Sequence, residues 1–281
     1  MFDANAPDAP PVDLAVWRTS SGTWFVLGGQ GSQQTTQTWG TTGDKPVPGD
    51  YDGDGKTDFC IYRKVTGQNS QWWILKSSDG NYYQVTFGTE EDKPAQADFD
   101  GDGKTDLALF RPSNGTWYIN QSSNSQTLTQ QFGLSSDEPA PADFDGDGRA
   151  DMTVWRHSET KFYSLNSTNL SVAINQLGLS GDKPVSSDYD GDGRADYALF
   201  RDSTATWYIK HSTTSTIEQL QWGVTGDKLV QNDYDGDGKT DLAIWRESNG
   251  NWYIRKSSTG GLRQVQWGMA GDIPVPAFYR R

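Results

Sequence analysis

Short apolar runs separated by polar turns recur along the chain every 45 residues, except where three extra residues in KVTGQNSQWW stretch one interval to 48. Four kinds of run recur, each six times, and none shows the 3.6-residue period of a helix. The runs are short and rich in β-branched and aromatic residues, which is typical of β-strands. The pattern therefore predicts an all-β chain with four strands per repeat.

Each kind of run has its own signature. The first is PVPxD-like and starts at Pro46, Pro94, Pro139, Pro184, Leu229 and Pro274. The second ends in an aromatic residue followed by arginine and starts at Leu14, Phe59, Leu107, Met152, Tyr197 and Leu242. The third opens on an aromatic pair such as Trp117-Tyr118, and the fourth closes on an apolar residue followed by glycine, such as Phe132-Gly133.

A repeat in the mid-forties with four strands predicts a β-propeller with one antiparallel blade per repeat. The alternative, a β-solenoid, usually has shorter repeats and needs a cap at both ends. The chain begins with the second, third and fourth runs of a repeat and ends with an isolated first run, GDIPVPAFYRR. These pieces complete one blade only if the two ends meet. We therefore predict a six-bladed β-propeller whose ring is closed by the C-terminal strand joining the N-terminal blade.

The repeat boundaries predict one propeller domain over residues 1–281 with an N-terminal tail at 1–11. The expected blades are 12–44 together with 272–281, then 45–92, 93–137, 138–182, 183–227 and 228–271.

An acidic loop lies between the first and second runs and occurs five times: DYDGDGKTD at 50–58, DFDGDGKTD at 98–106, DFDGDGRAD at 143–151, DYDGDGRAD at 188–196 and DYDGDGKTD at 233–241. Carboxylates occupy positions one, three, five and nine, which suits a hard cation with six to eight oxygen ligands. Glycine at position six permits the positive φ of a tight curl. Five copies favour a metal site over an ordinary polar turn, and magnesium is disfavoured because it demands compact octahedral geometry and keeps its waters.

The sequence thus predicts about five structural Ca²⁺ ions. The carboxylate ligands would be Asp50, Asp52, Asp54, Asp58, Asp98, Asp100, Asp102, Asp106, Asp143, Asp145, Asp147, Asp151, Asp188, Asp190, Asp192, Asp196, Asp233, Asp235, Asp237 and Asp241. Position seven would contribute its backbone carbonyl, with the cationic side chain pointing away, at Lys56, Lys104, Arg149, Arg194 and Lys239. An EF-hand loop has a bidentate Glu at position twelve, where Ile61 stands here, so Asp58 would close the site instead.

The net charge of −13 comes mainly from these loops, which hold 20 of the 37 acidic residues. Five bound Ca²⁺ would leave a formal charge of about −3. No basic stripe is present to neutralise phosphates, which argues against a nucleic-acid partner. No apolar run is long enough to span a membrane, and MFDANAPDAPP carries no basic-then-apolar signal. Loops of this kind fill where calcium is abundant, so we expect an extracellular or cell-surface location.

The DxDxDGxxD loop, the LAxxR strand after it and the Phe-Gly or Trp-Gly doublet resemble FG-GAP or VCBS-type repeats, the calcium-binding propeller repeats of integrin α-chains and many secreted bacterial proteins. The resemblance covers essentially the whole chain and implies a calcium-binding propeller. Integrin propellers have seven blades and six are counted here, so their ligand residues are not carried across. Some similar fungal lectins bind sugars between blades, which keeps glycan binding open.

On the face opposite the acidic loops, each predicted blade presents an arginine, an aromatic residue and an aspartate, for instance Arg111, Trp117 and Asp137. One interpretation is an ion pair that locks neighbouring blades, with the aromatic ring as a wedge. The other is a sugar site, in which the ring stacks on a pyranose. The candidate ligand residues are Arg18, Trp24, Arg111, Trp117, Arg201, Trp207, Arg246 and Trp252.

Catalysis finds little support in the sequence. The two histidines, His157 and His211, lie in different repeats with no motif around them, and the copies are nearly interchangeable. We therefore expect a monomeric, non-enzymatic binding or adhesion module with a protein or glycan ligand. The alternative is a lectin with repeated sites, and a polysaccharide-active enzyme is less favoured.

Overall fold

The predicted apolar runs form β-strands in the computed structural model, which describes residues 11–28 and 33–279. These residues divide into two units, residues 88–221 and residues 11–87 with 222–279, and each unit is described by itself. Residues 1–10 of the predicted N-terminal tail lie outside the described residues, as do Arg280 and Arg281 of the blade predicted to combine 12–44 with 272–281.

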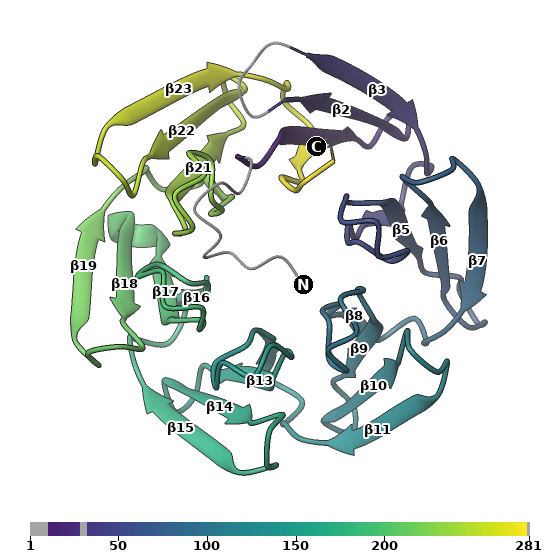
Figure 1. Cartoon of the computed structure of the whole chain (residues 1–281), viewed down its shortest axis with the longest axis horizontal. Coiled ribbons are helices and arrows are strands. Elements are labelled where there is room, and N and C mark those ends of the chain that lie inside the picture. The colour runs from purple at the N-terminus through teal and green to yellow at the C-terminus, as the bar shows by residue number, and fades with distance from the viewer. Residues whose placement is uncertain (1–10, 29–32, 280–281) are drawn as a thin grey trace. The chain divides into compact units, whose positions relative to one another are not determined.

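The unit of residues 88–221 holds three four-stranded antiparallel sheets, with strands in chain order within each sheet (Figure 1). The first sheet comprises β8 (Lys93–Pro94), β9 (Leu107–Arg111), β10 (Thr116–Asn120) and β11 (Thr127–Gln131). The second comprises β12 (Glu138–Pro139), β13 (Met152–Arg156), β14 (Lys161–Leu165) and β15 (Val172–Gln176). The third comprises β16 (Lys183–Pro184), β17 (Tyr197–Arg201), β18 (Thr206–Lys210) and β19 (Ile217–Gln221).

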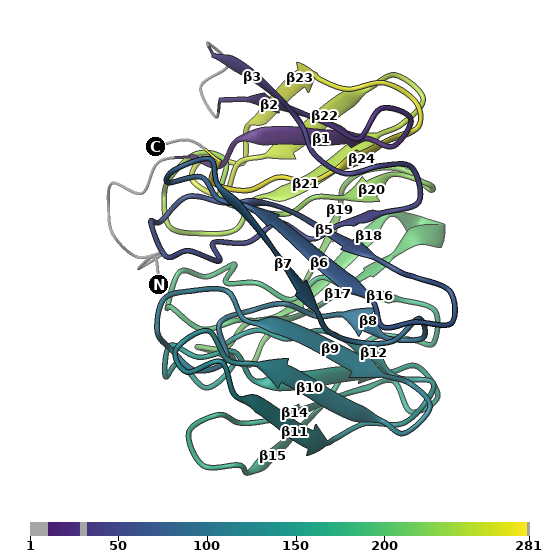
Figure 2. The ribbon, with the colours of Figure 1, turned by 90° about the vertical axis from the view of Figure 1, so that its right-hand side faces the viewer.

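The other unit also holds three such sheets. Two follow chain order: β4 (Lys45–Pro46), β5 (Phe59–Arg63), β6 (Gln71–Leu75) and β7 (Tyr82–Thr86), then β20 (Lys228–Leu229), β21 (Leu242–Arg246), β22 (Asn251–Arg255) and β23 (Leu262–Gln266). The third joins the chain ends, because β24 (Asp272–Pro274) pairs with β1 (Leu14–Arg18), followed by β2 (Thr23–Leu27) and β3 (Gln34–Thr38). Figure 2 shows the yellow β24 beside the purple β1.

Six sheets of four antiparallel strands make the fold a six-bladed β-propeller, and closure by the C-terminal strand is confirmed. The first strand of each blade is shorter than its run predicts. It has two or three residues, and in five blades its last residue is the proline that opens the predicted run. The residue after this position still donates to the second strand, as Ala95 N does to Ala108 O at 2.9 Å, so one more backbone hydrogen bond follows each short strand.

Helical structure in the described part of the chain is confined to a 3₁₀ turn, η1 (Asp202–Thr204). None of the described residues forms a helix with the length and apolar character needed to cross a membrane.

The core of each blade lies around its second and third strands. Leu107, Ala108, Leu109 and Phe110 of β9 are all buried, whereas β10 alternates between buried and half-buried positions after Thr116. The buried Trp117 ring donates from Nε1 to the carbonyl oxygen of Phe132 at 2.9 Å. This hydrogen bond fixes the end of the fourth strand, where the chain leaves for the next blade.

The glycine of the apolar-Gly doublet is required at that exit. Gly133 has φ 141°, and a Cβ atom there would lie 2.8 Å from the Phe110 ring. Only glycine fits both the backbone conformation and the close contact. The doublet therefore marks the point where each blade ends.

Candidate functional site

Each acidic loop joins the first strand of a blade to the second. An isolated antiparallel bridge closes every loop, pairing the residue before position one with the aspartate at position nine, as in Ala97 with Asp106. The same bridge joins Asp13 to Ala277 at the chain ends, where the opening acids are missing. The loops thus lie at strand-to-strand turns.

The backbone of each loop curls around the aspartate at position one. In the loop 98–106, Asp98 accepts hydrogen bonds from Gly101 N at 2.6 Å and from Gly103 N at 2.9 Å. The two glycines have φ of 80° and 85°. Asp106 accepts from Phe99 N at 2.9 Å. Positions four and six therefore both need glycine, and the backbone itself holds these carboxylates in place.

The carboxylates converge within the loops. In three loops an oxygen from each of positions one, three and nine lies within 4.8 Å of the other two: Asp50, Asp52 and Asp58; Asp98, Asp100 and Asp106; Asp143, Asp145 and Asp151. Asp188, Asp190 and Asp192 form a similar group in the fourth loop. Oδ1 of Asp190 and of Asp235 is buried without a hydrogen-bond partner among the described residues. Clustered carboxylate oxygens with unpaired acceptors fit a divalent cation.

Burial raises the pKa of the position-nine carboxyls. The pKa values of Asp58, Asp106 and Asp241 are raised to about 6, with the neighbouring third-position aspartate adding to the effect of burial. Burial also raises the pKa of the position-one aspartates, for example Asp98 and Asp233. Grouped, desolvated carboxylates favour a bound proton or a bound cation.

These shifts predict a pH dependence in the presence of a chelator. A carboxyl whose pKa rises on folding binds more protons in the folded chain, so its contribution to stability is full below the unfolded pKa and is lost as pH rises through the folded value. In excess chelator, we expect a higher melting temperature at pH 5 than at pH 7, measured by circular dichroism. A melting temperature that rises between pH 5 and pH 7 would contradict this assignment.

A pair of hydroxyl residues closes over each acidic loop from the turn between the third and fourth strands. Ser122 donates from its N to Asp106 Oδ1 at 2.7 Å and from Oγ to Asp102 Oδ1 at 2.9 Å. Ser123 Oγ donates to Asp100 Oδ2 at 2.6 Å. Equivalent pairs contact the other loops: Ser77-Ser78, Ser167-Thr168, Ser212-Thr213 and Ser257-Ser258. The repeated Ser-Ser or Ser-Thr doublet was the sequence signal for these positioning residues.

The side chain at position seven does not always point away from its loop. Arg149 donates from Nε to Asp147 Oδ2 at 3.0 Å and forms a second bond from Nη2. The expectation that this cation leaves the loop is therefore wrong for Arg149, because the carboxylate two residues earlier lies within reach of its long side chain.

The arginine at the end of each blade's second strand forms a bidentate ion pair with an aspartate. Arg156 donates from Nε to Asp137 Oδ1 at 3.0 Å and from Nη2 to Oδ2 at 2.8 Å. The corresponding pairs are Arg18–Asp272, Arg63–Asp44, Arg111–Asp92, Arg201–Asp182 and Arg246–Asp227. Arg111 thus binds the aspartate before its own blade rather than Asp137 after it. Asp137 also accepts from Leu134 N, so the pair fastens the connector to the second strand.

The tryptophans named as candidate ligand residues have no exposed surface: Trp24, Trp117, Trp207 and Trp252. Successive side chains of a strand point to opposite faces, and the first residue of each aromatic pair faces the core. The ring beneath each arginine is the second residue of the pair, with Arg111 Cζ 4.4 Å from the Tyr118 ring centroid. In the predicted trios, the arginine therefore lies at the surface and the tryptophan lies in the core.

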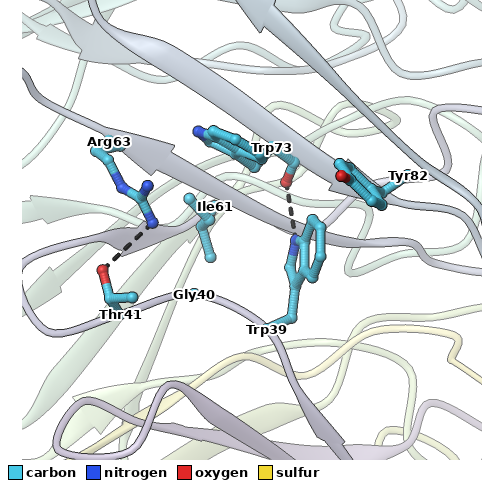
Figure 3. A pocket seen from close by; sticks show the side chains of 7 residues that line it. All are labelled: Trp39, Gly40, Thr41, Ile61, Arg63, Trp73 and Tyr82. Atoms are coloured by element: carbon cyan, nitrogen blue, oxygen red, sulfur yellow. Dashed lines mark hydrogen bonds between the residues drawn. The ribbon is translucent and has the colours of Figure 1, made fainter.

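One pocket of about 330 Å³ lies on the sheets β1–β3 and β4–β7. It is lined by Trp39, Gly40, Thr41, Ile61, Arg63, Trp73 and Tyr82. Figure 3 shows the Trp39, Trp73 and Tyr82 side chains grouped together, with Arg63 and Thr41 on the other side. The Tyr82 ring centroid lies 5.4 Å from that of Trp39 and 6.3 Å from that of Trp73. An aromatic wall thus faces one guanidinium group.

This pocket differs from the equivalent places in other repeats. Trp73 replaces a tyrosine or phenylalanine, Tyr82 replaces a smaller residue, and the three-residue insertion lies in the hairpin between β5 and β6. The side chain of Arg63 is 32% exposed, the highest of the six paired arginines. The sequence did not lead us to predict this pocket, although each departure from the repeat can be seen in it.

The two histidines have separate surroundings. His157 Nδ1 accepts a hydrogen bond from Trp155 Nε1, and its Nε2 lies 3.2 Å from Glu138 Oε2. His211 lies beside the fourth acidic loop, with Nε2 3.1 Å from Glu218 Oε2. They do not form a shared site.

Comparison with known proteins adds a family match. Residues 98–154 match the FG-GAP-like repeat. A comparison with curated proteins gave no match. Among solved structures the chain is similar to an Agrocybe aegerita lectin that recognises non-reducing terminal N-acetylglucosamine, at 14% identity and TM-score 0.62 over 96% of both chains.

Two further solved structures are similar. TolB from Acinetobacter baumannii has 16% identity and TM-score 0.66, covering 95% of this chain and 66% of that one. A streptogramin B lyase has 11% identity and TM-score 0.58, covering 94% and 85%. At these identities the similarity shows the fold alone.

The family match spans the acidic loop 98–106 and the strands that follow it, as far as Val154 of β13. The same strand order recurs in the other blades, and the same loop recurs in three of them besides the two loops that the match includes. Residues 98–154 thus match an FG-GAP-like repeat and lie within a six-bladed β-propeller.

Proposed function

We propose that the chain is a calcium-stabilised β-propeller that acts as a non-enzymatic binding or adhesion module outside the cell or at its surface. The observation that carries the proposal is the convergence of carboxylate oxygens in the acidic loops, with buried Oδ1 atoms on Asp190 and Asp235 that have no partner among the described residues. Five loops would hold five Ca²⁺ ions through the aspartates at positions one, three, five and nine. Bound calcium supplies the positive charge that the crowded carboxylates need.

The residues of the loops provide the rest of the site. Backbone N–H groups of the two loop glycines orient position one, and the Ser-Ser or Ser-Thr pair orients positions three, five and nine. Pre-orientation lowers the entropy lost when the cation binds. The metal would thereby fasten three elements in each of five blades, the first, second and third strands, rather than perform chemistry.

A binding role is supported more strongly than catalysis. The lectin structure matches over 96% of both chains, whereas the lyase is the enzyme among the three structures compared. The proposed location follows from the calcium requirement, since weak oxygen-ligand sites fill where calcium is abundant.

Carbohydrate recognition is a second candidate function, favoured by the pocket at Trp39, Trp73 and Tyr82. Aromatic faces stack on the apolar side of sugar rings, and a few polar groups fix the orientation. Arg63 and Thr41 supply such groups on the opposite side of the pocket. In the blade of β16–β19, Arg201 Nη1 donates to the hydroxyl of Tyr208, which is equivalent to Trp73. Because Trp73 has no hydroxyl, Arg63 does not make this hydrogen bond.

Replacing Tyr82 by Ala tests this second candidate. Tyr82 is 62% exposed, so its removal should leave the fold intact while removing one aromatic wall of the pocket. We expect glycan binding, found first on a broad array, to weaken at least tenfold in Tyr82→Ala by titration calorimetry. Leu262→Ala is the matched control, because Leu262 occupies the equivalent position at the start of β23. Equal affinities of the wild type and Tyr82→Ala would overturn the assignment, as would an array without hits.

A further inference from the structure

We propose that the acidic loop 188–196 forms, together with His211, a site for a transition-metal ion such as Zn²⁺ rather than a pure oxygen site for calcium. The inference rests on the proposed cation-binding role of the acidic loops. It replaces one of the five proposed calcium ions by a transition-metal ion and adds a nitrogen ligand. The site comprises Asp190, Asp196 and His211, whose donor atoms all lie within 4.8 Å of one another.

The spacing of the donors fits a small ion. His211 Nδ1 lies 3.5 Å from Asp196 Oδ2 and 3.7 Å from Asp190 Oδ2. Zinc holds nitrogen and carboxylate oxygen at about 2.0–2.2 Å, so two ligands of a tetrahedral ion lie about 3.4 Å apart. The observed spacings are close to that value. A modest closing of the side chains would complete three ligands, and water could supply the fourth.

Two donor atoms in this cluster are buried without a hydrogen-bond partner: Nδ1 of His211 and Oδ1 of Asp190. Nδ1 is close to two carboxylates, yet it is in hydrogen-bonding geometry with neither. A protonated imidazole held only by ion pairing would be expected to aim its N–H at one of them. An imidazole lone pair among carboxylate oxygens is instead unfavourable until a cation lies between them.

Glu218 gives His211 the arrangement that metal-binding histidines commonly have. Its Oε2 lies 3.1 Å from Nε2, so the carboxylate can accept the Nε2–H and leave Nδ1 unprotonated toward the loop. A carboxylate behind a histidine fixes the ring and raises the basicity of the ligating nitrogen. The strands β18 and β19, joined as a hairpin, hold these two residues together.

The other loops have no imidazole at this place. The residue before the Ser-Ser or Ser-Thr pair is Lys76, Gln121, Asn166 or Lys256 in the other four repeats. Calcium takes oxygen ligands, whereas imidazole suits zinc, copper and nickel. His211 therefore gives this loop a metal preference different from that of the other four loops.

The test uses Co²⁺ as a spectroscopic probe and Zn²⁺ as its competitor, on the whole chain with enough calcium to saturate the other loops. We expect one Co²⁺ per chain, with visible absorption bands of a nitrogen-containing site that Zn²⁺ abolishes. His211→Gln introduces the residue found at position 121 and should weaken Zn²⁺ binding at least 100-fold, because a direct ligand is lost. Glu218→Gln should weaken it about 10- to 100-fold. His157→Gln is the matched control and should leave Zn²⁺ binding unchanged.

Side-chain nitrogen NMR of the wild-type protein gives a readout that needs no variant to fold. Zn²⁺ should shift Nδ1 of His211 and leave His157 unmoved. Zn²⁺ binding that is equally strong in the wild type and His211→Gln, or histidine signals unmoved by Zn²⁺, would overturn the proposal. If either of these results were found while the melting temperature still depended on calcium, only the transition-metal site would be contradicted. The proposed function would still be supported.

Discussion

Replacing Asp137 by Ala is expected to lower the free energy of unfolding by about 3 kcal/mol, because it leaves the Arg156 guanidinium without its carboxylate partner. Asp137 is fully buried, and hydrogen bonding to it raises the pKa of Arg156. Breaking a buried pair typically costs about 3–5 kcal/mol, and the lower end applies because the Arg156 side chain keeps some contact with water. The connector also loses the bond from Leu134 N. Chemical denaturation in saturating calcium measures the effect.

Glu159→Gln provides the matched control for this prediction. Glu159 contacts the same arginine, with Arg156 Nη1 3.2 Å from its Oε1, but its side chain is 40% exposed. An exposed pair contributes about 0–1 kcal/mol. If Asp137→Ala cost no more than Glu159→Gln, the ion pair would not be the fastening that the geometry indicates.

The fold could be predicted because each strand of the repeat occurs six times in the sequence. One copy of the pattern would not separate a strand from a buried turn, but the constant spacing of the four runs defines the blade. The isolated run at 272–281 predicted closure, and β24 pairs with β1 as expected. The short length of the first strands could not be predicted from the apolar pattern, because it depends on where the backbone turns away from the second strand. The strand that ends at Leu229 is as short as those that end at a proline.

The candidate ligand face was harder to predict because successive residues of a strand point to opposite faces of the sheet. Both members of a pair such as Trp117-Tyr118 are aromatic, so the sequence does not say which one faces the core. The partner of Arg111 was equally open, since Asp92 and Asp137 both flank its blade, and the structure selects Asp92. Such choices depend on the direction of side chains and on how the connector folds back.

The acidic loops and the pocket show two different limits of sequence reasoning. The aspartate spacing predicts a cation site, yet the serine pair that orients the carboxylates lies 16 residues beyond Asp106 and meets it only in the folded sheet. The pocket combines Trp39, Trp73 and Tyr82 from three strands or strand ends. Each residue is an ordinary aromatic in the sequence, and only the fold brings the three together.

Removing calcium is expected to have the largest effect on stability. Without the ion, the carboxylates of each loop repel one another and remain desolvated, as the raised pKa values of Asp58, Asp106 and Asp241 indicate. A ligand at 100 times its Kd stabilises the folded state by about 2.7 kcal/mol per site, so several loops together contribute on the order of 10 kcal/mol. About 1 kcal/mol shifts the melting temperature of a chain near this size by roughly 2–4 °C.

The most direct test of calcium stabilisation is the melting temperature of the wild-type chain by scanning calorimetry at pH 7, in excess calcium and in excess EGTA. Magnesium at the same concentration as calcium serves as the control for ionic strength and charge. The predicted result is a fall of more than about 10 °C in EGTA, given the 2–4 °C expected per kcal/mol, that calcium reverses and magnesium does not. Equal melting temperatures in calcium and in EGTA would contradict the account.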